Sequence, residues 1–272
     1  MKKLLILATL ITSLTFSSAH GEDVSLMQDA RNPLADMIAL PIQTELYLGV
    51  GPDDEKVSVT TFQPVYPINL GEDWNIITRT LVPLIYVPES EEGLNVLPQG
   101  VGGDTEFGVG DINFSGFISP SNTGKYIWGV GGSISVPSAT DELLGSEKWS
   151  AGPSAVVLTQ EGSWNKGLLV RQLNSFAGED DRADVNQTLI QPWLYYSLNE
   201  EWYVFTEPVI TADWEQDEDQ RWVLPVGGGF GRAFYMGEQA VDVALSYYHH
   251  ADKPDNGPED VVRFSVQFLW PK

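Results

Sequence analysis

Hydrophobic and polar residues alternate along the last segment of the chain, residues 261–270. One side of this segment is apolar and consists of Val262, Phe264, Val266, Phe268 and Trp270. The other side is polar and consists of Arg263, Ser265 and Gln267. Successive side chains of a strand point to opposite faces, so the pattern predicts a strand with one apolar and one polar face. Such a strand occurs at the edge of a soluble sandwich, and it also closes outer-membrane β-barrels, where the apolar face meets lipid.

From residue 43 onward, strand-like runs alternate with turn-rich breaks of two kinds. Five breaks are short and are followed by an aromatic or polar strand start, at residues 70–74, 121–126, 161–164, 198–202 and 235–239. Six breaks are long and acidic, at residues 51–56, 88–105, 138–148, 178–185, 215–221 and 251–260. The two kinds alternate, so eleven connections join twelve strands. This sorting predicts an all-β fold, a closed antiparallel transmembrane β-barrel of about 12 strands, with short periplasmic turns and longer acidic extracellular loops.

Several runs have clean faces, among them residues 43–50, 126–136 and 241–248. The faces of residues 150–159 and 166–176 are ambiguous. Prolines fall inside the strand-like runs, and each removes a ladder hydrogen bond, so we expect them at bulges or strand ends. They are Pro64, Pro83, Pro192, Pro208 and Pro225.

Aromatic residues border nearly every connection. Beside the short turns stand Trp74, Tyr126, Trp164 and Trp202, and beside the acidic loops stand Tyr86, Trp149, Trp214 and Trp222. Trp270 ends the last strand. Amphipathic rings prefer the two membrane interfaces, so these residues predict two aromatic girdles. The alternative is that aromatic residues are simply common in strands.

The N-terminal residues have the features of a secretion signal. Two lysines precede an apolar run that ends in small residues, which predicts a signal peptide over 1–21. Residues 22–41 are then expected to form a periplasmic lead-in or plug segment, and residues 42–272 the barrel. An N-terminal membrane anchor is the alternative reading of the apolar run. The chain contains no cysteine, which excludes a disulfide framework.

The net charge of −23 and pI near 4.2 argue against binding to nucleic acid, whose phosphates would be repelled. The acidic residues gather in the long loops. Clustered carboxylates there could bind divalent cations weakly, in company with lipopolysaccharide, but the spacing matches no defined calcium loop. We expect no metal site and no cofactor.

Seven motifs resemble a family of Gram-negative outer-membrane proteins named for transport and for the MetA pathway of phenol degradation. They are NPLAD at 32–36, WNIITRT at 74–80, GVGDIN at 108–113, IWGVG at 127–131, KWSAGP at 148–153, DVNQ at 184–187 and VQFLWPK at 266–272. The resemblance extends over the mature chain and implies a β-barrel in the outer membrane. Transport of phenol-like compounds is what the family name implies. The final Pro271 and Lys272 depart from the usual aromatic ending of such barrels.

Charged residues within membrane strands must face the lumen, because a cation in mid-bilayer lipid costs about 2–4 kcal/mol. Strand parity therefore predicts a lumen lined by Glu45, Gln63, Arg79, Asp111, Asn113, Arg171, Gln187, Gln191, Glu207, Asp242, Arg263 and Gln267. These residues either brace the lumen through salt bridges or tune the selectivity of a conduit.

Catalysis has little support in the sequence. The histidines after the signal are His249 and His250, and no compact Ser, His and acid arrangement is visible. The glycine-rich runs lack the lysine and helix of a phosphate loop. The sequence thus favours a channel or transporter for small molecules, including hydrophobic or aromatic ones. A non-conducting structural barrel and a soluble periplasmic ligand-binding protein are the alternatives.

Overall fold

The computed structural model describes residues 30–89, 103–122 and 124–271. The predicted signal peptide and most of the predicted loop 88–105 lie outside these residues. The strands are β1 (Met37–Val50), β2 (Glu55–Phe62), β3 (Val65–Leu70), β4 (Trp74–Val87), β5 (Glu106–Val109), β6 (Ile112–Pro120), β7 (Tyr126–Val136), β8 (Lys148–Glu161), β9 (Trp164–Gly178), β10 (Asn186–Ser197), β11 (Trp202–Thr206), β12 (Ile210–Asp213), β13 (Trp222–Met236), β14 (Gln239–Asp252) and β15 (Asp260–Pro271). A single turn of 3-10 helix, η1, spans Glu142–Leu144.

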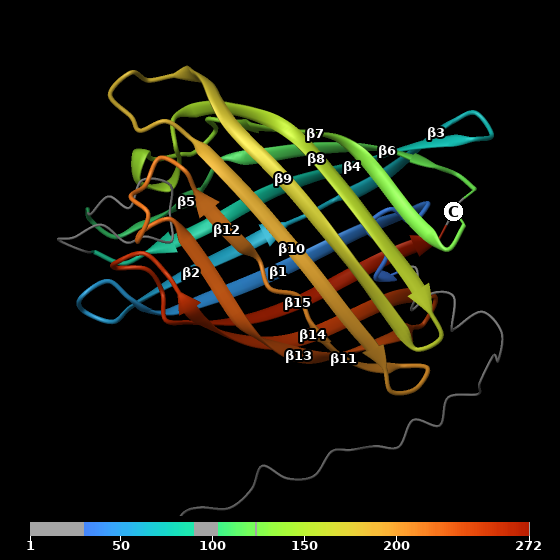
Figure 1. Cartoon of the computed structure of the whole chain (residues 1–272). Coiled ribbons are helices and arrows are strands. Elements are labelled where there is room, and N and C mark those ends of the chain that lie inside the picture. The colour runs from blue at the N-terminus through green and yellow to red at the C-terminus, as the bar shows by residue number, and fades with distance from the viewer. Residues whose placement is uncertain (1–29, 90–102, 123, 272) are drawn as a thin grey trace, which may run out of the picture.

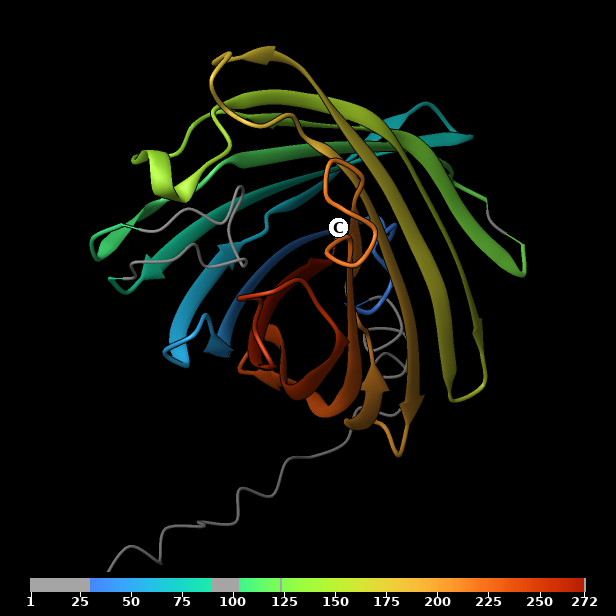
Figure 2. The ribbon, with the colours of Figure 1, turned by 60° about the vertical axis from the view of Figure 1, so that its left-hand side comes forward.

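The strands form one antiparallel sheet that closes on itself. Strands that follow one another in the chain pair, except at β2–β3, β5–β6 and β11–β12; β15 pairs with β1, and the pairing of β9 with β10 completes the ring. Three pairs of segments, β2 with β3, β5 with β6 and β11 with β12, each continue one strand across a short break. The prediction of a closed barrel of twelve strands is therefore confirmed. The long strands are steeply tilted (Figure 1), and Figure 2 shows them curving round a common axis.

Breaks in the ladder coincide with prolines. Pro64 lies between β2 and β3, and Pro208 lies between β11 and β12. Pro83 faces the break between β5 and β6, where its carbonyl accepts the Gly110 N–H at 3.0 Å. Pro192 lies in β10 opposite the Pro208 break, and Pro225 stands at a register shift in β13. The ladder is thus already interrupted at or beside each proline, which removes the conflict with a closed sheet.

The first strand begins at Met37 and not at residue 42, the expected start of the barrel. Met37–Pro41 is obscured in the sequence by its proline, but the last strand extends far enough to pair with it. Ala39 lies opposite Leu269, and both side chains are buried. The barrel therefore includes the end of the expected lead-in segment.

The two ends of the barrel differ in their connections. One end, here called the turn end, carries the short connections 71–73, 121–125, 162–163, 198–201 and 237–238. The other, the loop end, carries the connections 51–54, 88–105, 137–147, 179–185, 214–221 and 253–259, all of which except 51–54 are longer than those at the turn end. In Figure 1 the loop end lies on the left. Which end faces the periplasm stays a prediction. Within the described residues, no helix is long and apolar enough to cross a membrane.

Side chains alternate between an exposed outer face and a covered inner face along the strands. In β8, Val156 and Leu158 are buried inside, whereas Val157 between them is exposed. The exposed outer face carries a belt of large apolar residues that includes Leu46, Val130, Val157, Val170, Val204, Phe230, Leu245 and Phe264. The apolar faces therefore point outward from the ring and are not sealed between two sheets.

Candidate functional site

The interior of the barrel has three layers along its axis: a charged middle layer, an aromatic layer toward the turn end and an apolar layer toward the loop end. The middle layer is built around Arg263 of β15. Its guanidinium pairs with the Glu45 carboxylate on neighbouring β1 at 2.9 Å, and both side chains are largely buried. A buried pair of this kind holds both strands in register, because removing one partner would leave the other charge uncompensated.

Glu207 enters the same layer from the break between β11 and β12. Its backbone carbonyl accepts a hydrogen bond from Arg263 Nη1 at 3.2 Å, and its backbone N–H donates to the Tyr248 hydroxyl oxygen at 2.8 Å. Its carboxylate accepts hydrogen bonds from Gln191 Nε2 at 2.8 Å and from the Tyr195 hydroxyl at 2.7 Å. Pro208 interrupts the ladder here, so the backbone of Glu207 is free to make contacts inside the barrel.

The opposite wall of the middle layer carries Arg79 of β4 and Arg171 of β9. Arg79 donates to Gln63 Oε1, and Arg171 Nη1 donates to Asn113 Oδ1 at 3.3 Å. In the part of the chain that the structure describes, neither arginine has a carboxylate within ion-pair distance. This wall of the barrel is therefore richer in hydrogen-bond donors than the wall that carries Glu207.

Residues 30–36 lie inside the barrel at the turn end. Asn165 Nδ2 donates to the Arg31 carbonyl at 3.1 Å, and Gln267 Nε2 donates to the Ala30 carbonyl at 3.3 Å. The Arg31 guanidinium carbon stands 3.7 Å from the centre of the Tyr203 ring, a cation–π contact. Leu34 is buried in the core cluster of Leu34, Ile77, Phe117, Val156, Leu158, Leu169 and Trp193. This plug segment, residues 30–36, is thus fixed by contacts to distant strands.

Large rings form the inner wall next to the plug segment. Tyr195 stacks on Phe205 with ring centres 5.0 Å apart, and Tyr203 donates to Asp242 Oδ1 at 2.6 Å. Trp193 fits because residue 167 of the neighbouring strand is glycine, where an added Cβ would lie 2.1 Å from the ring. Small residues on one strand therefore make room for the aromatic side chains of the next.

A cavity of about 190 Å³ remains between the plug segment and this wall. Its lining is mixed and includes Arg31, Arg79, Leu169, Gln191, Trp193, Tyr195, Phe205, Glu207, Asp242, Ser265 and Gln267. An apolar cavity of about 150 Å³ is large enough for benzene, so this space has the size of a small aromatic molecule. Its polar groups would orient such a molecule.

The apolar layer at the loop end includes a residue from a distant loop. Leu144 of η1 is buried with Val50, Val57, Ile85 and Val87, which belong to β1, β2 and β4. The loop 137–147 joins β7 to β8, so Leu144 extends away from its own strands to join a cluster on β1, β2 and β4. We call it the mouth loop. Its position narrows the loop end of the lumen.

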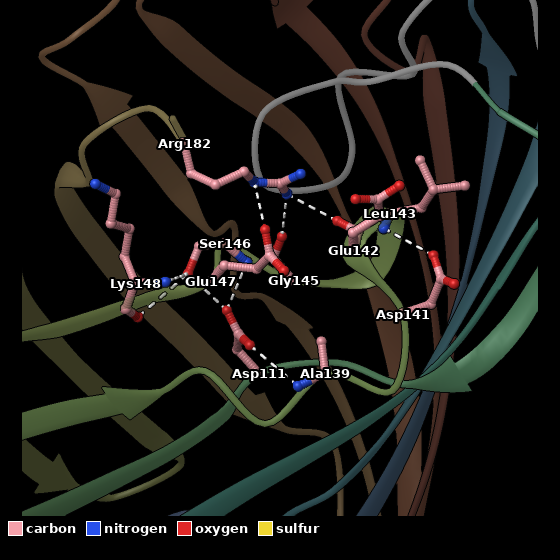
Figure 3. Close-up of polar contacts among 10 residues, drawn as sticks. All are labelled: Asp111, Ala139, Asp141, Glu142, Leu143, Gly145, Ser146, Glu147, Lys148 and Arg182. Atoms are coloured by element: carbon pink, nitrogen blue, oxygen red, sulfur yellow. Dashed lines mark hydrogen bonds and ion pairs between the residues drawn. The ribbon is translucent and has the colours of Figure 1, made fainter. Parts of the chain in front are cut away.

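Asp111 and Arg182 hold the mouth loop in place (Figure 3). The Asp111 carboxylate accepts hydrogen bonds from the backbone of Ser138, Ala139 and Ser146 and, at 2.6 Å, from the Ser146 hydroxyl. Arg182 Nη2 donates to the carbonyls of Glu142 and Gly145, both at 2.7 Å, and its Nε lies 3.2 Å from the Glu147 carboxylate. Asp111 was predicted to line the lumen, and its carboxylate binds the mouth loop.

The other predicted lumen residues lie on the inner side of the barrel, in strands or, for Gln63 and Glu207, in the breaks between strand segments. Glu45, Gln63, Arg79, Asn113, Arg171, Gln191, Glu207, Asp242, Arg263 and Gln267 come together in the middle layer or around the cavity. Gln187 is half-buried nearer the loop end. Parity did not identify Arg31 or Leu34, because residues 30–36 have no strand periodicity. The aromatic wall of Trp193, Tyr195, Tyr203 and Phe205 was also not identified from the sequence. These residues have the same odd parity as the inward-facing Gln191, so strand parity could have placed them on the inner face.

The predicted girdle residues lie at the strand ends. Trp74, Tyr86, Tyr126, Trp149, Trp164, Trp202, Trp214 and Trp270 are exposed, and Trp222 is half-buried. Trp74 and Trp128 make an edge contact at the turn end, with ring centres 6.2 Å apart. Trp214 and Trp222 do the same at the loop end, at 6.0 Å. Whether these rings meet the membrane interfaces stays a prediction.

The described residues contain no group of three or more His, Cys, Asp or Glu placed to hold a metal ion. His250 is buried near the loop end, with Nδ1 2.8 Å from the Pro258 carbonyl oxygen. His249 is exposed, with Nδ1 3.0 Å from Asp260 Oδ1. Neither histidine faces the cavity.

No protein-family model matches the sequence, and no curated protein matches it. Among solved structures, the chain is similar to the COG4313 outer membrane channel from Pseudomonas putida F1, with a TM-score of 0.60 and 13% sequence identity over 86% of this chain and 94% of that one. It is also similar to the CymD monoaromatic hydrocarbon channel, with a TM-score of 0.47 and 9% identity over 93% of each chain. A third similar structure is the outer membrane phospholipase A from Escherichia coli, with a TM-score of 0.44 and 8% identity over 92% of this chain and 98% of that one. The first similarity shows a shared fold, and the other two are too distant to support an argument.

Proposed function

We propose that the chain is an outer-membrane channel or transporter for small molecules, in particular hydrophobic or aromatic compounds. The observation that carries this proposal is a closed barrel with apolar residues outside and a cavity of about 190 Å³ inside, bordered by aromatic rings. The similar fold of the COG4313 outer membrane channel supports it.

The outer surface supports a membrane location. Large apolar side chains such as Val130, Phe230 and Phe264 are exposed at mid-strand. Soluble monomers rarely expose contiguous apolar patches of this extent, whereas lipid covers such a belt and a closed barrel satisfies its own backbone hydrogen bonds. A soluble periplasmic protein with this surface would associate or precipitate.

The cavity supports the class of solute. Trp193, Tyr195 and Phe205 contribute aromatic surface, and Leu169 adds aliphatic surface. Stacked and edge-on contacts between rings stabilise a pair by about 0.5–1.5 kcal/mol beyond simple burial. A small aromatic molecule can use these contacts, while a sugar of the same size would gain less from them.

A closed structural barrel is the second candidate function. It is favoured by the plug segment and the mouth loop, which both occupy the interior. In that case the predicted partners of the protein would be lipopolysaccharide and external molecules, contacted by the acidic loops, and the aromatic wall would serve only to hold the plug.

Uptake of the fluorescent hydrophobic probe phenylnaphthylamine by intact Gram-negative cells separates the two candidates. Intact lipopolysaccharide excludes this probe, so a channel of the proposed kind should raise its rate of uptake above that of cells with empty vector. Fractionation should place the protein with the outer membrane and require detergent for its release. A correctly localised, folded protein that leaves uptake unchanged would contradict the channel and favour the structural barrel.

A further inference from the structure

Arg79 and Glu207 carry opposite charges and border the same cavity, but they do not form an ion pair. Both side chains are half-buried, and both belong to the cavity lining. Among the described residues, neither has an oppositely charged side chain within ion-pair distance. Glu207 still acts electrostatically on Arg79 across the gap between them. A covered charge is costly unless it is paired and hydrogen-bonded, so this gap favours a charged occupant.

The two charges stand on opposite walls of the barrel. Arg79 belongs to β4, and Glu207 lies in the break between β11 and β12. The same number of strands separates these positions in both directions round the ring: β5/β6, β7, β8, β9 and β10 on one side, and β2/β3, β1, β15, β14 and β13 on the other. The cavity that both residues line therefore reaches from one wall to the opposite one.

The guanidinium of Arg79 has donors left over for a ligand. Its Nη2 donates to Gln63 Oε1, whereas its Nε and Nη1 make no hydrogen bond within the described residues. Neither atom is among the fully covered polar atoms that lack a partner, in contrast to Nε of Arg171. In the same part of the chain, Gln63 Nε2 is also unpartnered and not fully covered. This wall therefore presents donors to the cavity, and a group that binds here must accept.

The carboxylate of Glu207 is oriented but not neutralised. Its oxygens accept hydrogen bonds from two uncharged donors, Gln191 Nε2 at 2.8 Å and the Tyr195 hydroxyl at 2.7 Å. Arg263 donates to the backbone carbonyl of Glu207, not to its carboxylate. A carboxylate oxygen can accept more than one hydrogen bond, so Glu207 has capacity for a cationic donor.

The other charges of the cavity lining are engaged with protein groups. Arg263 is paired with Glu45 at 2.9 Å. Arg31 stands 3.7 Å from the centre of the Tyr203 ring, and the hydroxyl of Tyr203 donates to Asp242 Oδ1 at 2.6 Å. The unpartnered atoms of Arg31 and Asp242 are fully covered, so a ligand in the cavity does not reach them. Arg79 and Glu207 are therefore the two charges that a solute would meet.

Aromatic side chains line the wall that carries Glu207. Phe205 lies two residues before it, and Tyr195 pairs with Phe205 in register. Trp193 precedes Tyr195 by two residues and also lines the cavity. The cavity volume of about 190 Å³ exceeds the roughly 150 Å³ that suffices for benzene, which leaves room for a ring with a small polar head.

The two charges discriminate between classes of aromatic solute. An aromatic anion would pair with Arg79 and be repelled by Glu207, whereas an aromatic cation would pair with Glu207 and be repelled by Arg79. A neutral ring would leave both charges unpaired. A zwitterion satisfies both at once, with its carboxylate toward Arg79 and its ammonium toward Glu207.

We propose that the cavity is a binding site for a small aromatic zwitterion, of the kind represented by the aromatic α-amino acids. The planar guanidinium of Arg79 matches the two oxygens of the carboxylate. The ammonium pairs with Glu207 beside the rings of Tyr195 and Phe205, where cation–π attraction adds to the ion pair. The solute ring packs on the aromatic wall. This inference names a class of solute for the proposed function and rests on it.

Titration calorimetry of the folded protein in detergent, with L-phenylalanine and two relatives that each carry one charge, tests the site. 3-Phenylpropionate lacks the ammonium, and phenethylamine lacks the carboxylate. Loss of a hydrogen bond between charged groups weakens binding about tenfold or more, so the wild-type protein should bind L-phenylalanine at least about tenfold more tightly than either relative. Glycine has both charges without the ring and should also bind at least about tenfold more weakly.

Two substitutions assign the charges to their walls. In Arg79→Gln, the affinity for L-phenylalanine should fall to that for phenethylamine, and phenethylamine should bind no more weakly than to the wild type. In Glu207→Gln, the same should hold for L-phenylalanine and 3-phenylpropionate. Arg232→Gln is the matched control and should bind all four compounds like the wild type, because Arg232 is an exposed arginine near the turn end whose partner is Glu201.

The comparison of compounds on the wild-type protein does not depend on the folding of any variant. Equal affinity for L-phenylalanine and either one-charge relative would overturn the site. A protein that prefers L-phenylalanine in calorimetry but leaves probe uptake unchanged would contradict the proposed function and not the site. Raised uptake without a preference among the compounds would contradict the site and not the proposed function.

Discussion

The two ends of the barrel interior are closed in different ways. At the loop end, Leu144 completes an apolar cluster, and the mouth loop satisfies its backbone groups through Asp111 and Arg182. At the turn end, the plug segment is held by side-chain contacts, and the Nε and Nη2 atoms of Arg31 are buried without hydrogen-bond partners. The cavity lies at this second end.

This difference indicates which end opens more easily. An apolar cluster with satisfied hydrogen bonds is costly to expose to water. Unpartnered polar atoms carry a desolvation cost in the docked state, and water relieves that cost when the segment leaves. We therefore expect the plug segment to be the more weakly held of the two closures.

The largest effect is expected from removing the two anchors of the plug segment together, as Arg31→Ala with Leu34→Ala. Truncating a buried leucine costs about 2–5 kcal/mol, enough to shift a docked segment largely to the undocked state. Single-channel conductance in planar bilayers should rise clearly. Leu34→Met, which conserves volume, serves as the control and should conduct like the wild type. An unchanged conductance in the double variant would show that the plug segment does not limit the path.

A smaller effect is expected at the loop end from Asp111→Ala. The substitution leaves four donors of the mouth loop without their acceptor, at a cost of about 1–3 kcal/mol for groups that stay covered. Protease cleavage within residues 137–147 of the folded protein in detergent should become faster. Asp141→Ala is the comparison, because the carboxylate of Asp141 accepts one hydrogen bond among the described residues, from the Leu143 N–H at 2.9 Å. Equal cleavage rates in the two variants would show that Asp111 does not hold the loop.

The smallest effect concerns Asp184, beside the mouth loop on the connection 179–185. Hydrogen bonds from the Ser175 hydroxyl and from Lys148 hold the pKa of this carboxyl below its usual value of 3.8. Because folding lowers this pKa, the contacts of the carboxylate stabilise the folded protein at pH values above the usual pKa. This stabilisation is lost as the pH falls through the lowered pKa. Asp184 is exposed, so the change will be slight. Cleavage of this connection should rise at strongly acidic pH in the wild type and lose that dependence in Asp184→Asn.

Most of the barrel could be predicted from the sequence because strand faces and connections depend on residues that are close together in the chain. Alternation along residues 261–270 and the sorting of connections by length report on faces and strand count directly. The positions of the plug segment and the mouth loop could not be predicted in this way. Arg31 meets Ser197, 166 residues away in the chain, and Leu144 packs on strands that its own strands do not touch. Such contacts depend on the shape of the closed barrel.

Asp111 illustrates the same limit within the candidate site. The parity argument assumes that Asp111 belongs to a strand. In the structure Asp111 lies just before β6, where the ladder of hydrogen bonds is broken opposite Pro83. Its carboxylate is therefore available to the mouth loop. Arg79 and Arg171 obey parity, yet the hydroxyls of Ser115, Ser133 and Ser154 meet only once β6, β7 and β8 are placed side by side.

Filling the cavity from one strand tests most directly whether solutes pass through the turn end of the barrel. Ser265→Trp places a ring in the cavity, whereas Phe264→Trp places the same ring on the exposed outer face one residue away. Uptake of phenylnaphthylamine by intact cells should fall to the empty-vector rate in Ser265→Trp and stay at the wild-type rate in Phe264→Trp. If both variants are folded in the outer membrane and take up the probe equally fast, the cavity is not on the path of the solute.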